Sequence, residues 1–259
     1  MYIVAVHNMS GDSAQMAKGL AAILGVTAYE ARPRVTVAGG GPAVVASFAD
    51  AQQAEECVVA LHVAGFDPLC IDSSVLENDQ NRFITQRLSF TAEAVKLWDH
   101  SGAELSVNYA DVLLLLRGAG IVSHVQSETT TTKKFAVGRA LATGGLMMRK
   151  KVTTTTASVN SERQPFCHLY AQDLPAIVLR QDGVDYACLG SERKLSREAN
   201  FTWICCELRR LCSTACWDER LQTKPVLAQV LGPVFDPEVD LDLAITLVAA
   251  SRLAAGVAK

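Results

Sequence analysis

Residues 200–217, NFTWICCELRRLCSTACW, carry the clearest helix pattern in this 259-residue sequence. Their apolar positions recur at i, i+3, i+4 and i+7, the spacing of one face of an α-helix. That face comprises Phe201, Ile204, Cys205, Leu208, Leu211, Cys212 and Ala215. Asn200 or Ser196 can supply the N-cap oxygen. The pattern predicts a helix that packs on the segments before it, and it leaves Cys206 on the opposite side.

The segments that precede this helix alternate or run apolar, as β-strands do. Strands are expected at residues 83–91, 94–99, 104–116, 166–171, 176–180 and 186–189. Antiparallel strands closed by one amphipathic helix resemble the plan of pleckstrin-homology-like domains, and RLSFTAEAVKLWDHSGAELSVNYADVLLLL is similar to their opening strands. The resemblance implies an antiparallel β-barrel with a C-terminal capping helix over about 82–217. It implies no catalytic residue.

The first 72 residues predict a small α+β unit of a different kind. Strand-like and helix-like segments follow in the order β-α-α-β-α-β, which predicts a three-stranded sheet with helices on one face. Three glycines, Gly39 to Gly41, precede the second strand and are followed by Pro42. A phosphate-binding loop needs glycines that open a helix after a strand, so these residues are interpreted as a turn.

Within this unit, LGVTAYEAR, PAVVASF and AEECVVALHVAGFDPLCI resemble the fold shared by the ribosomal stalk protein's C-terminal domain and the Clp-protease N-degron adaptor. The adaptor family has an Asn-Asp pair after its first strand that holds a peptide's amino terminus. Here Asn8 follows His7, but the next residue is Met9, and Asp12 is the nearest acid. Peptide binding is therefore not transferred from the family to this chain.

The expected organisation is α+β, with a βααβαβ sandwich followed by the barrel domain. The boundaries place the sandwich at 1–72, a linker at 73–82, the pleckstrin-homology-like domain at 83–217 with an insertion at 127–158, and a loop with a C-terminal helix at 218–259. The whole chain also resembles an uncharacterised family of bacterial proteins, which implies no activity.

Composition excludes several classes of protein. The net charge of −3 argues against a nucleic-acid binder, and the 49% apolar content is that of a chain with a substantial core. The first residues lack a basic segment, so no signal peptide is expected, and no apolar run is long enough to span a bilayer. A cytoplasmic location is predicted, in which the eight cysteines behave as small apolar residues.

No pattern for metal, cofactor or catalytic chemistry stands out. Cys212 and Cys216 are four residues apart on the predicted helix, and Cys205 precedes Cys212 by one heptad. Further ligands would have to come from Cys188, Cys167 or His168, so packing in the core is the favoured interpretation of these thiols. No metal, no cofactor and no catalytic residue is predicted, although a site assembled from distant positions is compatible with the sequence.

The Thr-rich segments SETTTTKK and KKVTTTTAS nearly mirror each other around a glycine-rich apolar centre, within the 127–158 insertion. Basic residues flank that centre: Lys133, Lys134, Arg139, Arg149, Lys150 and Lys151. Cations beside apolar residues can hold an anionic membrane surface, an acidic protein or a nucleic-acid backbone. These residues form the candidate binding site, and the alternative is a β-hairpin that packs on its own domain or on a second copy.

The favoured function is non-catalytic binding, as an adaptor or scaffold for a protein partner that the sequence does not identify. The first alternative is a peripheral membrane or anionic-ligand module that uses the basic residues. The second is an enzyme of unrecognised type with a site between the domains. A homodimer is a further expectation, because the Thr-rich segments could pair with those of a second copy.

Overall fold

The computed structural model describes residues 1–135 and 149–257, with side chains described at 1–120 and 163–255. The chain divides into two units. The first combines Met1–Gly120 with Gln164–Lys259, and the second is Ile121–Arg163. Each unit is described by itself below. The fold is mixed α and β, with several open sheets.

The N-terminal elements follow the predicted order. They are β1 (Tyr2–His7), α1 (Ser13–Leu24), α2 (Ala28–Val35), β2 (Ala43–Phe48), α3 (Ala51–Val63) and β3 (Asp67–Asp72). The strands form an antiparallel sheet in the order β2-β1-β3. Asp12, Thr27 and Asp50 each accept a backbone hydrogen bond at a helix N-terminus, which fixes where the three helices begin.

One face of this sheet is covered by its three helices. Val4 and Val6 of β1 pack against Leu20 of α1, Ala31 of α2 and Leu61 of α3, and all five side chains are buried. Because side chains alternate along a strand, Ile3 and Ala5 point to the opposite face, and they are buried as well. That second face must therefore be covered by another part of the chain.

The middle of the chain contains two further sheets. Their elements are η1 (Ser73–Val75), β4 (Phe83–Thr85), β5 (Arg87–Phe90), β6 (Ala94–Trp98), β7 (Glu104–Asn108), η2 (Tyr109–Asp111), β8 (Val112–Phe135), β9 (Arg149–Ala171), β10 (Ile177–Arg180), η3 (Tyr186–Glu192), α5 (Arg197–Leu211) and β11 (Cys216–Leu221). One sheet has the order β11-β8-β9-β10-β4, and the other has the order β5-β6-β7.

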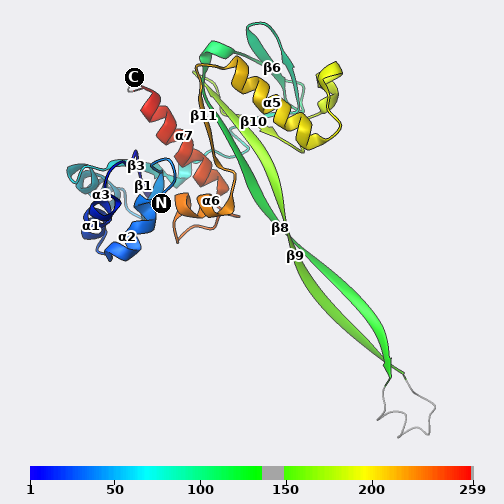
Figure 1. Cartoon of the computed structure of the whole chain (residues 1–259), viewed down its shortest axis with the longest axis horizontal. Helices are drawn as coiled ribbons and strands as arrows, with labels where there is room; N and C mark the ends of the chain where they lie inside the picture. The colour runs from blue at the N-terminus through cyan, green and yellow to red at the C-terminus, as the bar shows by residue number, and fades with distance from the viewer. Residues whose placement is uncertain (136–148, 258–259) are drawn as a thin grey trace. The chain divides into compact units, whose positions relative to one another are not determined.

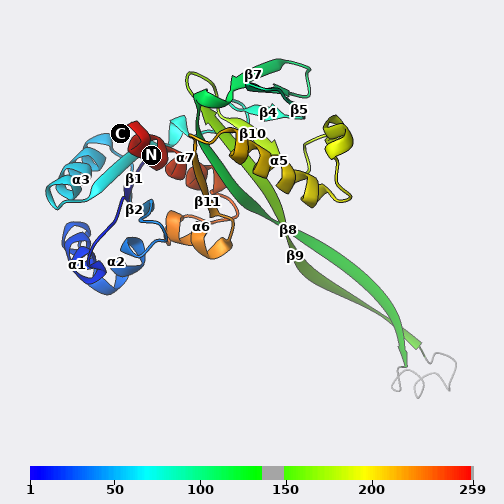
Figure 2. The same ribbon diagram turned by 45° about the horizontal axis from the view of Figure 1, so that its top comes forward.

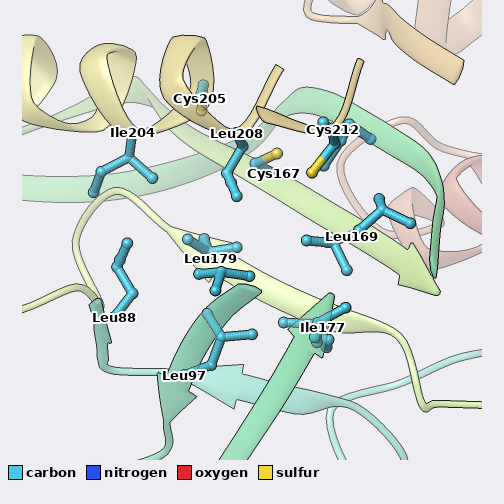
Figure 3. Close-up of a cluster of buried hydrophobic side chains, with 14 of the residues drawn as sticks. Leu88, Leu97, Cys167, Leu169, Ile177, Leu179, Ile204, Cys205, Leu208 and Cys212 are labelled. Carbon is cyan, nitrogen blue, oxygen red and sulfur yellow. The ribbon is translucent and has the colours of Figure 1, made fainter. Parts of the chain in front are cut away.

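Helix α5 covers the core between these sheets, as its apolar stripe predicts. Phe201, Ile204, Cys205 and Leu208 are buried against residues of β5, β6, β9 and β10. Figure 3 shows Ile204 and Leu208 above Leu88, Leu97 and Leu179, with the Cys167, Cys205 and Cys212 sulfurs beside them. Ser196 is the N-cap, since its side chain accepts from the Ala199 backbone N–H. Cys206 is exposed.

The prediction of a closed antiparallel barrel over 83–217 is wrong for the residues that the structure describes. None of the sheets closes, and two strand pairs are parallel, β10 with β4 and β11 with β8. The alternation of apolar residues indicates strands but not their neighbours, so the sequence did not reveal these pairings. The strand expected at 186–189 is instead the 3₁₀-helix η3.

The segment 218–259, expected as a loop with a C-terminal helix, is part of the core. It continues β11 and adds two helices, α6 (Lys224–Leu231) and α7 (Leu241–Val257). Helix α6 contacts β2, and α7 contacts both β3 and β11. Figures 1 and 2 show α7 between the sheet of β1 and β3 and the strand β11. Helices α6 and α7 therefore cover the second face of the N-terminal sheet.

Helix α7 is buried on most of its circumference. Its buried residues are Leu243, Ala244, Ile245, Leu247, Val248, Ala249 and Ser251. A helix that is apolar on nearly every side is stable only when it is enclosed. This explains why its sequence lacks a clean amphipathic stripe.

Ion pairs hold both ends of α7. Near its start, Arg82 Nη1 donates to Asp242 Oδ1 at 2.6 Å, and the Arg82 side chain is only 1% exposed. Near its end, Arg252 Nε donates to Asp218 Oδ2 at 2.6 Å. Burial works to raise the pKa of Asp218, but hydrogen bonds from Arg220 and Arg252 outweigh it and hold that pKa below its usual value.

Strands β8 and β9 continue into the second unit, where they form a two-stranded antiparallel ribbon. The two Thr-rich segments are thus neighbouring strands, as their mirrored pattern suggests. Across the part of the chain that the structure describes, no helix is long and apolar enough to cross a membrane.

Replacing Arg82 tests how far α7 depends on its first ion pair. Arg82→Met leaves the carboxylates of Glu77, Asp79 and Asp242 without their buried cation, and we expect the free energy of unfolding in urea to fall by about 3 kcal/mol. Arg180→Met is the matched control, because Arg180 also pairs with Asp79 but is 42% exposed. We expect a loss within about 1 kcal/mol there. Equal losses in the two variants would contradict this account of α7.

Candidate functional site

A cleft of about 520 Å³ lies at the end of β1 in the N-terminal unit. It is lined by residues that follow β1, by the first turns of α1 and by the turn before β3. The lining residues are His7, Asn8, Met9, Ser10, Gly11, Asp12, Gln15, Met16, Gly19, Ala64, Gly65, Phe66 and Asp67. This cleft is the candidate functional site.

Asn8 turns the chain away from β1 at the mouth of the cleft. Its φ is +53°, in the left-handed region that asparagine tolerates better than most residues. The next residue is held by a backbone hydrogen bond from the Met9 N–H to the Gly40 carbonyl, at 3.0 Å. The glycine turn therefore fixes the path of the chain along one wall of the cleft.

The turn of Gly39 to Gly41 needs glycine because two backbone segments approach closely. A Cβ on Gly41 would lie 2.8 Å from the Val6 carbonyl oxygen, and a Cβ on Gly40 would lie 3.2 Å from the Met9 nitrogen. Both glycines have positive φ, 94° for Gly41 and 76° for Gly40. The interpretation of these glycines as a turn is confirmed, and the turn also supports the site.

Asp67 supplies the acidic group of the cleft. It is the first residue of β3 and pairs with His7 in the register between β1 and β3. The Asn8 side-chain amide donates to Asp67 Oδ2 at 3.2 Å. The bond uses an N–H of the Asn8 side chain and one oxygen of Asp67. The side-chain oxygen of Asn8 and the second carboxylate oxygen of Asp67 therefore remain as acceptors.

His7 borders the cleft but has a buried side chain. The residue is among those that line the cleft and is only 8% exposed. By the alternation along β1, its side chain points to the same face of the sheet as Ile3 and Ala5, away from α1. Its Nδ1 has no hydrogen-bond partner among the described residues.

The lining combines acceptors with an apolar wall. Asp12 and Asp67 are its charged residues, and no Lys or Arg is among the residues that line it. Met16 and Phe66 contribute the apolar surface, and the Phe66 ring lies against Gly19, where a Cβ would be 3.7 Å from it. Such a site favours a ligand with a cationic hydrogen-bond donor next to an apolar group.

The cations predicted as a binding site lie elsewhere. Lys133 and Lys134 come just before the end of β8, and Arg149, Lys150 and Lys151 open β9. The two groups therefore share one end of the ribbon. Arg139 lies outside the described residues, as do the side chains of the other five, so the binding role of this group stays a prediction.

The cysteines considered as metal ligands divide between the core and the surface. Cys167, Cys205 and Cys212 are buried in the core, whereas Cys216 is exposed on β11. A thiol–thiol hydrogen bond with Cys205 and burial raise the pKa of Cys167, and burial raises the pKa of Cys212 to about 11. These thiols stay protonated and behave as apolar packing residues. Within the described ranges, no group of three or more His, Cys, Asp or Glu residues is placed to hold a metal ion.

A second polar cluster lies beside α7, but it lacks the form of a ligand site. The Tyr170 hydroxyl donates to Glu77 at 3.0 Å, and Arg82 lies 3.7 Å from the same carboxylate. Burial raises the pKa of Glu77, while burial and then the charges of Arg82 and Arg180 lower the pKa of His168 well below its usual value. The cleft at the end of β1 and two further clefts of the described chain are lined by other residues. We interpret the cluster as structural.

No family model, no curated protein and no solved structure matches this chain. The resemblances drawn from the sequence therefore stay predictions.

The sequence did not predict this cleft: Asn8 was compared with the adaptor pair but not taken as a binding residue, and Asp67 was not considered. Asp67 is far from Asn8 in sequence, and only the antiparallel pairing of β1 with β3 brings them together. The signal was available in principle, because an Asp that opens the strand next to β1 lies opposite the last residue of β1.

Substitution of Gly41 tests whether the turn supports the cleft wall. We expect Gly41→Ala to lower the free energy of unfolding by roughly 2–3 kcal/mol, through positive φ and contact with the Val6 carbonyl. Gly25→Ala is the control, because Gly25 has a φ of +66° but no atom within 4 Å of the place where a Cβ would lie. In that variant we expect the free energy of unfolding to fall by only about 1 kcal/mol, because the alanine is strained in the left-handed region but meets no neighbouring atom. Losses of the same size in urea unfolding would argue against the close approach.

Proposed function

We propose that this chain is a non-catalytic binding protein, and that its cleft at the end of β1 holds a ligand with a free ammonium group beside an apolar side chain. The amino terminus of a peptide has this chemistry. The observation that carries the proposal is the Asn8–Asp67 hydrogen bond, which gathers unused acceptors at the mouth of a cleft whose lining contains no Lys or Arg.

The balance of donors and acceptors supports an ammonium ligand. An ammonium group offers three donors and a positive charge, and it can bond at once to a carboxylate and to an amide carbonyl. Hydrogen bonds between charged partners are the stronger ones, particularly where the site excludes part of the water. An anionic ligand would instead meet Asp12 and Asp67 with no cation in the lining to offset them.

The apolar wall supports selection by the neighbouring side chain. Met16 and Phe66 are adjacent to the polar mouth, and methionine adapts to side chains of different shape. A ligand whose first residue is apolar would bury that side chain there, whereas a polar first residue would gain less.

The resemblance of residues 1–72 to the N-degron adaptor family is consistent with this proposal. In that family, an Asn-Asp pair after the first strand holds a peptide's amino terminus. Asn8 stands at the position of the Asn, while the acid beside it is Asp67 of β3 in place of the following residue. This chain therefore has the same pair of groups, an amide and a carboxylate, but the carboxylate comes from a different strand and the geometry of the pair differs.

Attachment to an anionic surface through the basic residues of the ribbon is the second candidate. It is favoured by the placement of Lys133 and Lys134 and of Arg149 to Lys151 at the same end of β8 and β9. An adaptor that binds a peptide with one unit and a charged surface with the other would combine both candidates.

Peptide binding measured by fluorescence anisotropy tests the proposal. A set of short labelled peptides with apolar first residues is prepared with a free or an acetylated amino terminus. We expect the free form to bind at least about tenfold more tightly, because acetylation removes the charge and leaves only one of the three N–H donors.

Variants locate the binding in the cleft. Asp67→Asn should weaken binding of the free peptide by about tenfold or more, since one charge-assisted bond is replaced by a neutral one. Glu55→Gln, on the exposed surface of α3, removes the same charge elsewhere and should leave the affinity unchanged. Unfolding curves confirm that both variants are folded. Equal affinity for free and acetylated peptides would reject the proposal.

A further inference from the structure

The ribbon of the second unit has two outer edges without a partner strand among the described residues. Strand β10 pairs with β9 over Phe166 to Leu169, and β11 pairs with β8 from Leu114 to Gly118. Beyond these ladders, no third strand adjoins β8 or β9 over the described residues 121–135 and 149–162. Each strand therefore presents one row of unpaired backbone N–H and C=O groups.

Such a ribbon is an unusual final state for a folded chain. An isolated two-stranded hairpin is marginally stable in water, and stability requires a third strand or a covering layer. Edge strands of natural sheets usually carry charged residues, prolines or bulges that prevent pairing with another chain. Where those features are missing, the edge is a template for a further strand.

The edge of β9 lacks these protective features over most of its length. Residues 152–161 read VTTTTASVNS, a run with no charge and no proline, and it is rich in residues that favour strands. The corresponding part of β8 contains Glu128 and ends with Lys133 and Lys134. The β9 edge is therefore the one that is open to pairing.

We propose that β9 pairs with β9 of a second copy of this chain, antiparallel and around a two-fold axis. The product is a four-stranded sheet in the order β8-β9-β9-β8, in which the two edges without charges are covered. Because the same surface is used by both copies, the contact closes on itself and does not propagate into a fibre.

The charge pattern of β9 favours this orientation. The strand begins with Arg149, Lys150 and Lys151, and Glu162 lies near the end of its ribbon part. Antiparallel pairing separates the three cations of one copy from those of its partner and places them toward the end that carries Glu162 and Arg163. Parallel pairing would align the three cations of one copy with those of its partner, which is destabilising.

Light scattering on the full-length protein tests the proposal. We expect a mass of two chains that falls toward one chain on dilution, because a dimer of this kind depends on concentration. A mass of one chain, 27.8 kDa, at all concentrations would overturn the proposal.

Proline variants identify the edge. Successive N–H groups along a strand point to opposite sides, so of two adjacent prolines one removes an inward donor and the other an outward donor. In β9, Thr154→Pro and Thr155→Pro should both give monomers, one by opening the ribbon and the other by blocking the edge.

The matched variants in β8 are Thr130→Pro and Thr131→Pro. Only the one that removes an inward donor should give a monomer, and the other should leave the dimer intact, because the outer edge of β8 is not used. Circular dichroism distinguishes an opened ribbon from a blocked edge. Dimers that persist in both β9 variants, or a pattern reversed between the two strands, would overturn the proposal.

Discussion

Helix α7 is the constraint on which the first unit depends. It is buried on most sides, contacts β3 of the N-terminal sheet and β11 of the five-stranded sheet, and is held near its two ends by Arg82 and Asp218. Ion pairs of this kind contribute little net stability, but removal of one partner is strongly unfavourable. Helix α7 thus packs against strands of two sheets at once. Without the helices of the last segment, Ile3 and Ala5 on the second face of the N-terminal sheet would be exposed.

Local patterns in the sequence predicted much of this architecture. The stripe in α5 correctly predicted that Phe201, Ile204, Cys205 and Leu208 are buried, because a helix of that length must bury one apolar face. The helix ends at Leu211, however, and the expected positions 212–217 lie outside it. Asp12, Thr27 and Asp50 begin the three helices of the N-terminal unit, because their oxygens accept backbone N–H bonds there. The Gly39 to Gly41 turn was also recognised. In each case, the residues that decide the structure lie within a few positions of one another.

Features that depend on distant pairings were not predictable from local patterns. Strand β11 pairs parallel to β8, so a barrel expected from consecutive hairpins does not form. A C-terminal helix was expected, but its local pattern did not indicate that α7 is enclosed on most sides and contacts both β3 and β11. The acid of the cleft was missed for the same reason, since Asp67 reaches Asn8 only through the β1–β3 register.

The N-terminal sheet, which α7 covers, also positions the cleft, because the pairing of β1 with β3 brings His7, Asn8 and Asp67 together. NMR titration of the isotope-labelled protein with a peptide that has a free apolar amino terminus tests the central claim most directly. We predict that the backbone amides of Asn8, Gly11 and Asp67 shift with the free peptide and do not shift with its acetylated form. Shifts confined to residues outside the cleft, or shifts of equal size with both peptides, would contradict the account.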